Sequence, residues 1–540
     1  MNHLIAPNKA LGYSKLYLDF LADLPSARRL YGSGDLPAVA QQLDRHAAHR
    51  PSMVHILRCQ NTAFGASERT LAAIEQLLDP KALCVFAGQQ AGLFGGPMMT
   101  LIKALGAVNR ARQFSQELGR PVVPIFWIAA DDHDFAEANH TWLLNRESEL
   151  VRVSYDTPPA SALSMGKTRF SDQEALDRAI SAYRASLGET EFTLWLYDLL
   201  DRSYTSGETF VSAFGRFMAA LTTDTGLILF DPSDPEVKRL AAPFFGSMLD
   251  RQVAITDAIH GANQLLRESG YHVQVEKDQQ ATHLFLDQNA RTPVTRDSGQ
   301  FRAGDRSYDE HELRSIIDSE PERLSPDALL RPVMQSYLLP VVGQLGGPSE
   351  IAYFAQMSSL FPLFDLPAPV RLARPTLTLV ESRYEKMMDE FGITFDELTG
   401  DIELVVNRVL TASFPADLEQ RYSQLRADVA SRFEEFSSQS LQFDPSVSEF
   451  AKQTFGKIDF SLRQFEDKLF AGHKKKQKEM RDRLYRLGRS LYPNRGLQER
   501  TLNVAYFVAK HGREIVSFVH QRMDANQTAH QLISLAEFKK

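Results

Sequence analysis

Cysteine is scarce in this sequence: its 540 residues include only Cys59 and Cys84, which do not form a CxxC pair. This scarcity excludes a disulfide framework and a cysteine-rich structural zinc site. Long apolar runs are also missing, since no stretch of about 18 apolar residues occurs. The stretch MNHLIAPNKALGYSKLYLDF lacks the basic start and apolar core of a secretion signal. We therefore expect a cytoplasmic protein that does not interact with a membrane.

A strong net charge of either sign is absent as well. The formal net charge of -8 is small for this length, which argues against a dedicated nucleic-acid-binding protein. The composition is that of an ordinary globular protein, with 43% hydrophobic and 24% charged residues. The chain is too long for one hydrophobic core, and its length predicts about two to four domains.

The stretch 83–140 has the pattern of a βαβ unit. Leu83 to Ala87 is a short apolar run typical of a strand buried on both faces, and Gly88 ends it. Apolar residues recur at helical spacing from Met98 to Arg112, and a second apolar run extends from Ile125 to Ala130. The strands of such a unit are parallel, and ligands bind beyond their carboxyl ends. We therefore expect the polar residues that follow both strands to form a site.

A glycine-rich turn, Gly88 to Pro97, joins the first strand to the helix. It is neither a GxGxxG nor a Walker A motif, because no Lys-Ser/Thr pair follows its glycines. One interpretation is a tight turn without a ligand. The other is a helix N-terminus that binds phosphate or carboxylate, with Lys103 either adding charge or solvated. The candidate binding residues of this segment are Gly88, Gln89, Gln90, Gly95, Gly96, Pro97 and Lys103.

A polar cluster follows the second strand and consists of Asp131, Asp132, His133, Asp134, Asn139 and His140. One interpretation is a polar loop with an aspartate that caps a helix starting at Phe135. The other is an active site that uses a general base or a cation. We assign catalytic roles to Asp132, His133 and Asp134, with Asp132 as the base, and substrate or nucleotide binding to Asn139 and His140. The histidines lack zinc-binding spacing, so we assign no metal ligand and leave a divalent-metal requirement open.

The remainder of the first 380 residues mixes helical and strand patterns. Residues 1–80 are mainly helical, and Gly226 to Phe230 predicts another buried strand. Val237 to Gly261 predicts a helix, and 271–275 with 283–286 predicts a hairpin. We interpret 1–380 as the core of an α/β protein with a parallel sheet, into which about 155–225 and 265–325 are inserted.

A second strand, glycine-rich turn and helix is expected within 324–355. Tyr337 to Val342 predicts a strand, Gly343 to Pro348 predicts a turn, and Ser349 is a good start for a helix. Each polar side chain here is explained about equally well by an exposed helix surface. The candidate binding residues are Gln344, Gly346, Gly347, Glu350, Tyr353 and Gln356.

The composition changes from Glu381 onward, where glycine becomes rare, charges alternate, and apolar residues keep helical spacing to Leu491. We expect an antiparallel helical coiled coil over 381–495, with a break near Phe443 to Pro445. Such a hairpin usually packs against a second copy or another domain, and we expect a homodimer. Residues 496–540 are apolar enough to pack back on the core as helices.

Four long motifs resemble the BshC family, which comprises cysteine ligases of bacillithiol biosynthesis. They are FAGQQAGLFGGP, PVVPIFWIAADDHDFAEANH, LRPVMQSYLLPVVGQLGGPSEIAYFAQ and LYPNRGLQER, in this order. The resemblance implies a Rossmann-like core related to nucleotidylyl-transferring ligases, inserted connecting segments, and a C-terminal coiled coil that mediates dimerisation. It also implies that cysteine is added to the amino group of glucosaminyl malate.

Formation of this amide requires activation of the cysteine carboxylate, most simply by ATP as a cosubstrate. In this hypothesis Gln89, Gln90 and Gly95 to Pro97 hold phosphate or carboxylate, while Asp132 and His133 deprotonate or orient the amine. Two alternatives stay open: another nucleotide-dependent transferase on the same core, and a non-catalytic coiled-coil scaffold. Whether the nucleotide binds at the core or at the coiled coil is also open.

Overall fold

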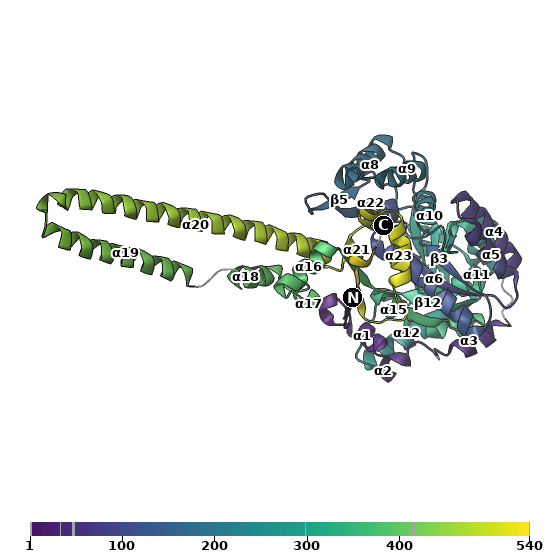
Figure 1. Ribbon diagram of the computed structural model, residues 1–540. Coiled ribbons are helices and arrows are strands. Elements are labelled where there is room, and N and C mark those ends of the chain that lie inside the picture. The colour runs from purple at the N-terminus through teal and green to yellow at the C-terminus, as the bar shows by residue number, and fades with distance from the viewer. Residues whose placement is uncertain (1–2, 33, 46–48, 298, 413–416, 539–540) are drawn as a thin grey trace. The chain divides into compact units, whose positions relative to one another are not determined.

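The computed structural model describes residues 3–32, 34–45, 49–297, 299–412 and 417–538. The chain divides into two compact units, one made of Met1–Ser382 with Leu491–Lys540 and the other of Arg383–Ser490 (Figure 1). The C-terminal segment thus belongs to the same unit as the N-terminal part of the chain. Within the described ranges, no helix has both the length and the apolar character needed to cross a membrane.

A five-stranded parallel sheet lies at the centre of the first unit, in the order β13, β12, β2, β3, β6 (Figure 1). Its strands are β2 (Leu83–Gln89), β3 (Val122–Ile128), β6 (Ile228–Phe230), β12 (Val341–Gly346) and β13 (Val370–Ala373). Every residue of β3 is buried, as expected for a strand covered on both faces. The predicted α/β core with a parallel sheet is confirmed, and the carboxyl ends of β2, β3 and β12 meet at one edge.

Helix α6, Met98–Leu118, connects β2 to β3 and packs on both strands. It extends past the predicted end at Arg112 and is followed by Gly119, whose φ of 63° gives the left-handed conformation common after helices. Its first half is buried on nearly all sides. Gly106 permits this close packing, because a Cβ there would lie 2.8 Å from the Pro375 ring.

Helices and small sheets surround the central sheet. The N-terminal helices are α1 (Lys15–Leu21), α2 (Pro25–Arg28), α3 (Leu36–Leu43), α4 (Arg50–Ala63) and α5 (Glu68–Glu75). The segment between β3 and β6, which includes the first inserted region, holds α7 (Phe135–Ala138), the hairpin β4 (His140–Leu144) and β5 (Leu150–Ser154), α8 (Gln173–Leu187), α9 (Thr193–Ser203) and α10 (Phe210–Leu221). The C-terminal segment contributes α21 (Gln498–Thr501), α22 (Ala505–His511) and α23 (Glu514–Arg522), and β15 (His530–Ser534), which pairs with β1 (His3–Ile5) and β14 (Leu377–Val380).

The second inserted region forms its own sheet, in the order β10, β9, β8, β7, β11. The strands are β7 (Ala281–Asp287), β8 (Arg291–Asp297), β9 (Gln300–Ala303), β10 (Arg306–Tyr308) and β11 (Leu324–Pro326), all antiparallel, with α13 (Glu310–Ser319) nearby in sequence. Before it lie α11 (Pro235–Asp250) and α12 (Gln252–Glu268), and after it α14 (Arg331–Leu338) and α15 (Pro348–Phe354).

Three local predictions were wrong. The predicted hairpin partner 271–275 is not a strand, because the Gln356 side chain bonds both the N–H and the C=O of Val275; β7 pairs with β8 instead. Residues 337–338 end helix α14, whose start is favoured by Pro332. Strand β12 extends from Val341 to Gly346, so most of the predicted turn Gly343 to Pro348 belongs to the strand. The single helix predicted over 237–261 is two helices that meet at Arg251.

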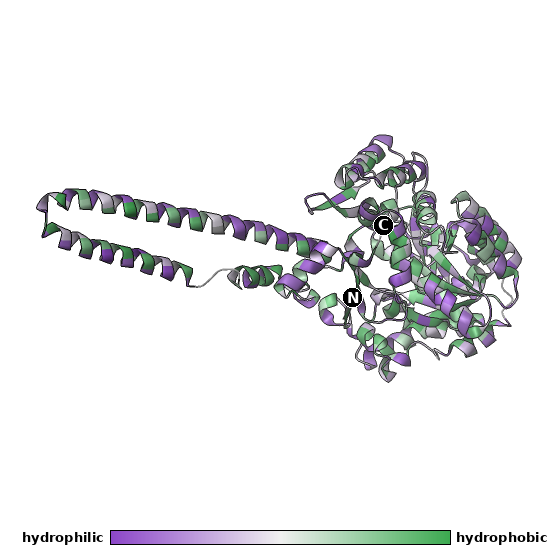
Figure 2. Ribbon diagram, in the orientation of Figure 1, coloured by the Kyte–Doolittle hydropathy of each residue, from purple (hydrophilic) through white to green (hydrophobic). Residues whose placement is uncertain are grey.

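The second unit contains the predicted antiparallel pair of long helices. They are α19 (Leu418–Leu441) and α20 (Ser448–Leu491), preceded by the shorter helices α16 (Ser382–Phe391), α17 (Phe395–Leu398) and α18 (Ile402–Ala412). The Tyr422 hydroxyl donates to the Leu462 carbonyl, Arg426 pairs with Asp459, and Phe433 contacts Phe455. The residue numbers rise along α19 while those of the partners fall along α20, so the two helices are antiparallel. Hydrophobic residues continue along both helices (Figure 2).

Candidate functional site

A cavity of about 330 Å³ opens at the carboxyl ends of β2, β3 and β12. Parallel sheets bind ligands at this edge. The lining residues from the predicted segments are Gly88, Gln89, Gln90, Asp132, Gln344, Gly347, Glu350 and Tyr353. The lining also includes Glu137, Arg331, Gln335, Ser349, Arg374 and Arg500, and the apolar side chains Phe86, Met99, Trp127, Leu345 and Phe354. The structure therefore brings residues from both predicted strand-turn-helix segments to one place.

One wall of the cavity is acidic. The Gln90 Nε2 donates to Asp132 Oδ2 and to Glu137 Oε2, in both cases at 3.0 Å. This orientation of the amide is the only one in which its two N–H groups meet two carboxylates. Desolvation and the neighbouring carboxylates of Asp134 and Asp132 raise the pKa of Glu137, while the Gln90 hydrogen bond opposes the increase. Two carboxylates on one amide are an arrangement suited to binding a cation or accepting a proton.

Three arginines also line the cavity: Arg331, Arg374 and Arg500. Arg374 is only 3% exposed and pairs with buried Glu499 at 2.6 Å. Its Nη2 has no hydrogen-bond partner within the described residues. Arg331 donates to the Tyr353 hydroxyl at 3.2 Å. Three guanidinium groups around a small cavity are suited to carboxylate or phosphate groups.

Lys103 lies beneath the cavity instead of lining it. Its Nζ donates to the Gly88 carbonyl at 2.6 Å and forms an ion pair with Glu350, whose carboxylate also accepts the Gly347 N–H at 2.8 Å. Burial lowers the pKa of Lys103, and Glu350 opposes that decrease. The lysine thus ties the end of β2 to the end of β12, and its contacts are structural.

The turn formed by Gly95, Gly96 and Pro97 does not line the cavity, which corrects the expected anion-binding turn. The Gly95 N–H donates to Tyr204 and to the Gly92 carbonyl, and the Gly96 N–H donates to the Leu93 carbonyl. The N–H of Met98 donates to the Leu502 carbonyl, and the side-chain amide of Asn503 donates to the carbonyls of Phe94 and Gly96. These protein partners occupy the groups that we expected to meet an anion.

The polar cluster after β3 divides in the structure. Asp132 lines the cavity, but His133, Asp134, Asn139 and His140 do not. Asp134 caps α7 by accepting the Glu137 N–H at 2.9 Å, and the His133 side chain is 43% exposed. Asn139 is buried and donates to the Tyr155 carbonyl, and His140 begins β4 with its Nδ1 3.1 Å from the Ala136 carbonyl. The capping interpretation therefore describes Asp134, and the site interpretation suits Asp132.

The candidates of the second segment divide in the same way. Gln344 lines the cavity, donates to Gln335 at 2.8 Å and accepts from Arg371. Gln356 does not line it, because its side chain is buried against Asn263 and the Val275 backbone. Gly346 also lies outside the lining. Its lack of a side chain lets the Phe354 ring pack closely, since a Cβ there would be 2.8 Å from that ring.

Six polar lining residues were missed as site candidates from the sequence: Glu137, Arg331, Gln335, Ser349, Arg374 and Arg500. All but Arg374 lie within the four motifs that carry the family resemblance, which is the signal that pointed to them. Arg374 follows β13, the strand next to β12 in the sheet, and only the strand order reveals this proximity. In the described part of the chain, no group of three or more His, Cys, Asp or Glu side chains is arranged to hold a metal ion.

Comparison with known families agrees with this architecture over nearly the whole chain. Residues 1–375 match the family model described as "Bacillithiol biosynthesis BshC, N-terminal Rossmann-like domain", and residues 377–535 match "Bacillithiol biosynthesis BshC, C-terminal coiled-coil domain". The chain belongs to the BshC family. In these terms the cavity combines both matched regions of a BshC chain, because Arg500 lies in the second and all the other lining residues lie in the first.

Individual BshC relatives cover most of the chain as well. The "Putative cysteine ligase BshC" of Koribacter versatilis is 31% identical over 509 residues, which are 93% of this chain and 94% of the relative. The protein of the same name from Salinibacter ruber is 29% identical over 547 residues, 98% of each chain. That of Geobacillus kaustophilus is 30% identical over 480 residues, 86% of this chain and 87% of the relative.

Proposed function

We propose that this protein is an amide-forming ligase that joins the carboxyl group of cysteine to the amino group of glucosaminyl malate, with ATP as the activating cosubstrate. The names of its relatives support a cysteine ligase. The observation that carries the proposal is the cavity at the carboxyl edge of the sheet, which is lined by both carboxylates and arginines.

The lining groups match the charges of the proposed substrates. Glucosaminyl malate carries two malate carboxylates and one amine, and cysteine brings a carboxylate of its own. Arg331, Arg374 and Arg500 are suited to the carboxylates and to phosphate oxygens. Asp132 and Glu137 are suited to the amine, which is an ammonium ion before reaction. The cavity therefore offers partners for each charged group of both substrates.

Positioning is the main catalytic contribution expected of this site. An amide bond forms only after the cysteine carboxylate has become a mixed anhydride with phosphate, and the amine must then meet its carbonyl carbon. Holding both groups at the same edge of the sheet replaces a bimolecular encounter in solution by a reaction between groups that are already in position. The apolar side chains Trp127, Phe86 and Phe354 limit the water that competes for the activated carboxyl group.

The proposal is tested by incubating the purified protein with cysteine, glucosaminyl malate and ATP. We expect the cysteinyl amide, detected by mass spectrometry, and release of a nucleotide product in equal amount. Cysteine-dependent exchange between pyrophosphate and ATP tests activation as an adenylate. Nucleotide consumption that does not depend on cysteine would favour another transferase, and no turnover with any combination would favour a scaffold.

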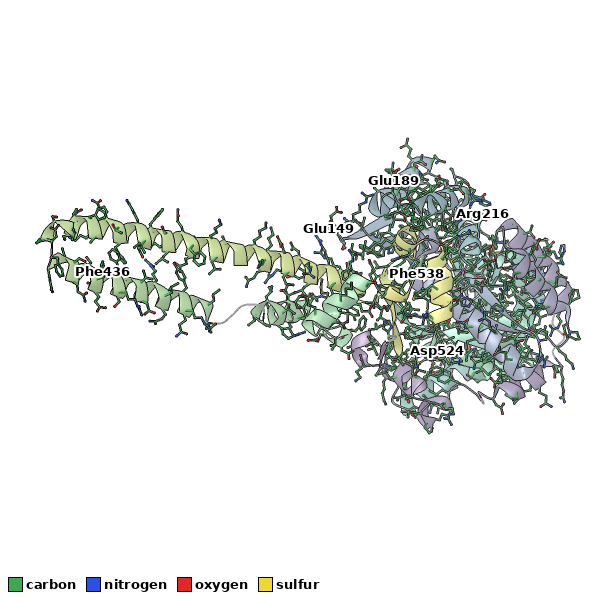
Figure 3. All side chains as sticks on the ribbon, in the orientation of Figure 1. Glu149, Glu189, Arg216, Phe436, Asp524 and Phe538 are labelled. Carbon is green, nitrogen blue, oxygen red and sulfur yellow. The ribbon has the colours of Figure 1, made fainter. Side chains whose placement is uncertain are left out.

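We also propose that the second unit forms a homodimer and that the protein acts in the cytoplasm. Large apolar side chains stay exposed along α19, α20 and the connection between them, which is unusual for a surface that contacts only water. They are Leu425, Phe436, Phe443, Phe450, Phe460 and Phe465, with exposed fractions from 49% to 92% (Phe436 is labelled in Figure 3). A second copy of the same helical pair would cover these side chains symmetrically.

A further inference from the structure

Three carboxylates line the cavity, those of Asp132, Glu137 and Glu350, and the differences in their surroundings decide which one is available to a substrate. Glu350 uses its Oε2 for Lys103 and for the Gly347 N–H. Asp132 accepts from Gln90 through one oxygen and from the His133 N–H, at 2.8 Å, through the other. Within the described residues, Glu137 accepts a hydrogen bond only from Gln90.

Glu137 is also well placed in the fold. It lies in the short helix α7 directly after the loop that follows β3, and Asp134 holds the start of that helix by accepting the Glu137 N–H. Its side chain reaches the cavity, where the Gln90 amide links it to Asp132. A carboxylate that is accessible, held by one donor and close to a second carboxylate is better suited to receive a proton than one whose oxygens are occupied.

We propose that Glu137 accepts the proton from the attacking amine, and that Gln90 and Asp132 position it. This inference rests on the proposed ligase function and assigns a role that sequence reasoning gave to Asp132 and His133. His133 does not line the cavity. An amine in the cavity would therefore contact the lining carboxylates before it contacts His133.

The charges around Glu137 favour the same role. The carboxylates of Asp134 and Asp132 and partial desolvation raise its pKa, whereas Gln90 and Arg500 lower it to a smaller extent. A proton acceptor works best when its pKa approaches that of the donor, and an ammonium ion is a much weaker acid than an ordinary glutamic acid. The increase therefore brings Glu137 closer to its proton donor.

The transfer step balances as follows. The ammonium group loses one proton to Glu137, and its freed electron pair attacks the carbonyl carbon of the activated cysteine, a mixed anhydride with the α-phosphate of a nucleoside triphosphate. The C–N bond forms, and the C–O bond to phosphate breaks, so that the nucleoside monophosphate leaves with the electron pair. The nitrogen loses its second proton to water as the amide forms.

Replacement of the carboxylate by an amide tests this role. Glu137→Gln keeps the volume and a hydrogen-bonding group, so we expect Tm to stay near that of the wild type. The rate of amide formation should fall by about 100-fold or more, while KM for glucosaminyl malate changes little. Cysteine-dependent exchange of pyrophosphate into ATP should stay close to the wild-type rate, because it precedes the proton transfer. Glu147→Gln, which removes an exposed carboxylate from the β4–β5 turn, is the matched control.

A second nucleophile distinguishes proton transfer from a structural role. Hydroxylamine is neutral at pH 7 and needs no base before it attacks, so Glu137→Gln should form cysteine hydroxamate nearly as fast as the wild type. Equal amide formation by Glu137→Gln and wild type would overturn the inference alone. Loss of exchange and of hydroxamate together would overturn it as well, because Glu137 would then act in activation. A wild type without either half-reaction would overturn both the inference and the ligase proposal.

Discussion

Asp132 and His133 are adjacent in the chain but have different environments, since only Asp132 lines the cavity. We expect Asp132→Asn to reduce amide formation by about 100-fold, because it removes the carboxylate that shares Gln90 with Glu137. His133→Ala should reduce the rate of amide formation less than about tenfold, because its side chain does not line the cavity and is 43% exposed. Steady-state kinetics with thermal melting of both variants measure this difference. Equal losses in two folded variants would return His133 to the catalytic group.

Gln90 donates a hydrogen bond to the Glu137 carboxylate, and this bond lowers the pKa of that carboxyl group. Only ionised Glu137 accepts a proton, so the rate should fall as the pH decreases through its pKa. Gln90→Leu removes the donor and should move this acidic limb to higher pH. The pH dependence of kcat measures the shift, with Glu147→Gln as a control that leaves the limb in place. A limb that moves to lower pH would contradict the assignment.

At the scale of elements, the turn before α6 is a packing device. Gly95 has a φ of 87°, and a Cβ there would lie 3.0 Å from the Phe217 ring. We expect Gly95→Ala to lower the free energy of unfolding by about 1–3 kcal/mol, since it adds backbone strain and overpacking. Gly119→Ala is the matched control, because its φ of 63° brings strain but no neighbour lies within 4 Å of the added atom. Urea denaturation compares the two, and equal losses would exclude a contribution from Phe217.

The second inserted sheet is joined to the segment before α14 by Asp327. This buried carboxylate accepts from His283 at 2.9 Å and from the N–H groups of Leu329 and Leu330, and it pairs with Lys277 at 3.0 Å. Burial alone would raise its pKa, but His283 and Lys277 lower it well below the usual range. Because the pKa is lower in the folded state, this stabilisation is complete above the unfolded pKa and is lost as the pH falls towards the folded value.

Asp327→Asn should therefore lower the free energy of unfolding by about 3 kcal/mol at pH 7, since it leaves Lys277 and buried His283 without their carboxylate partner. The difference from the wild type should shrink as the pH decreases from about 5 to 3. Thermal melts across this range measure it, and Asp305→Asn, at an exposed position between β9 and β10, is the control. A difference that does not change with pH would contradict the electrostatic explanation.

At the scale of the whole molecule, the proposed homodimer places the interface between copies in the second unit. We expect a chain in which Arg383–Ser490 is replaced by a short Gly-Ser linker to be a folded monomer, because Ser382 and Leu491 both belong to the first unit. Analytical ultracentrifugation of the two proteins measures this. The full-length double variant Phe436→Ser, Phe460→Ser is a second test that keeps the helices, since both side chains are exposed. A dimer that persists in both variants would place the interface elsewhere.

Much of the architecture follows from local patterns. The apolar run 83–87, the helical spacing after Pro97 and the run 125–130 predicted the βαβ unit, because strands buried on both faces and buried helices require these periods. The same reasoning located the two long helices and the break near Phe443. Polar residues directly after buried strands predicted the edge of the sheet where the cavity lies.

The sequence by itself thus determined the sheet, the helical pair and the edge at which the cavity opens, since each depends on burial and turn conformation over a few neighbouring residues. Only the tertiary structure decided which polar groups face one another. Arg374 and Arg500 reach the cavity because β13 pairs with β12 and α21 packs against α6. The amides of Gly95 and Gly96 are occupied by distant protein partners for the same reason. Such contacts depend on strand order and on packing between remote segments, so the hydrophobic periodicity of a short stretch of sequence does not predict them.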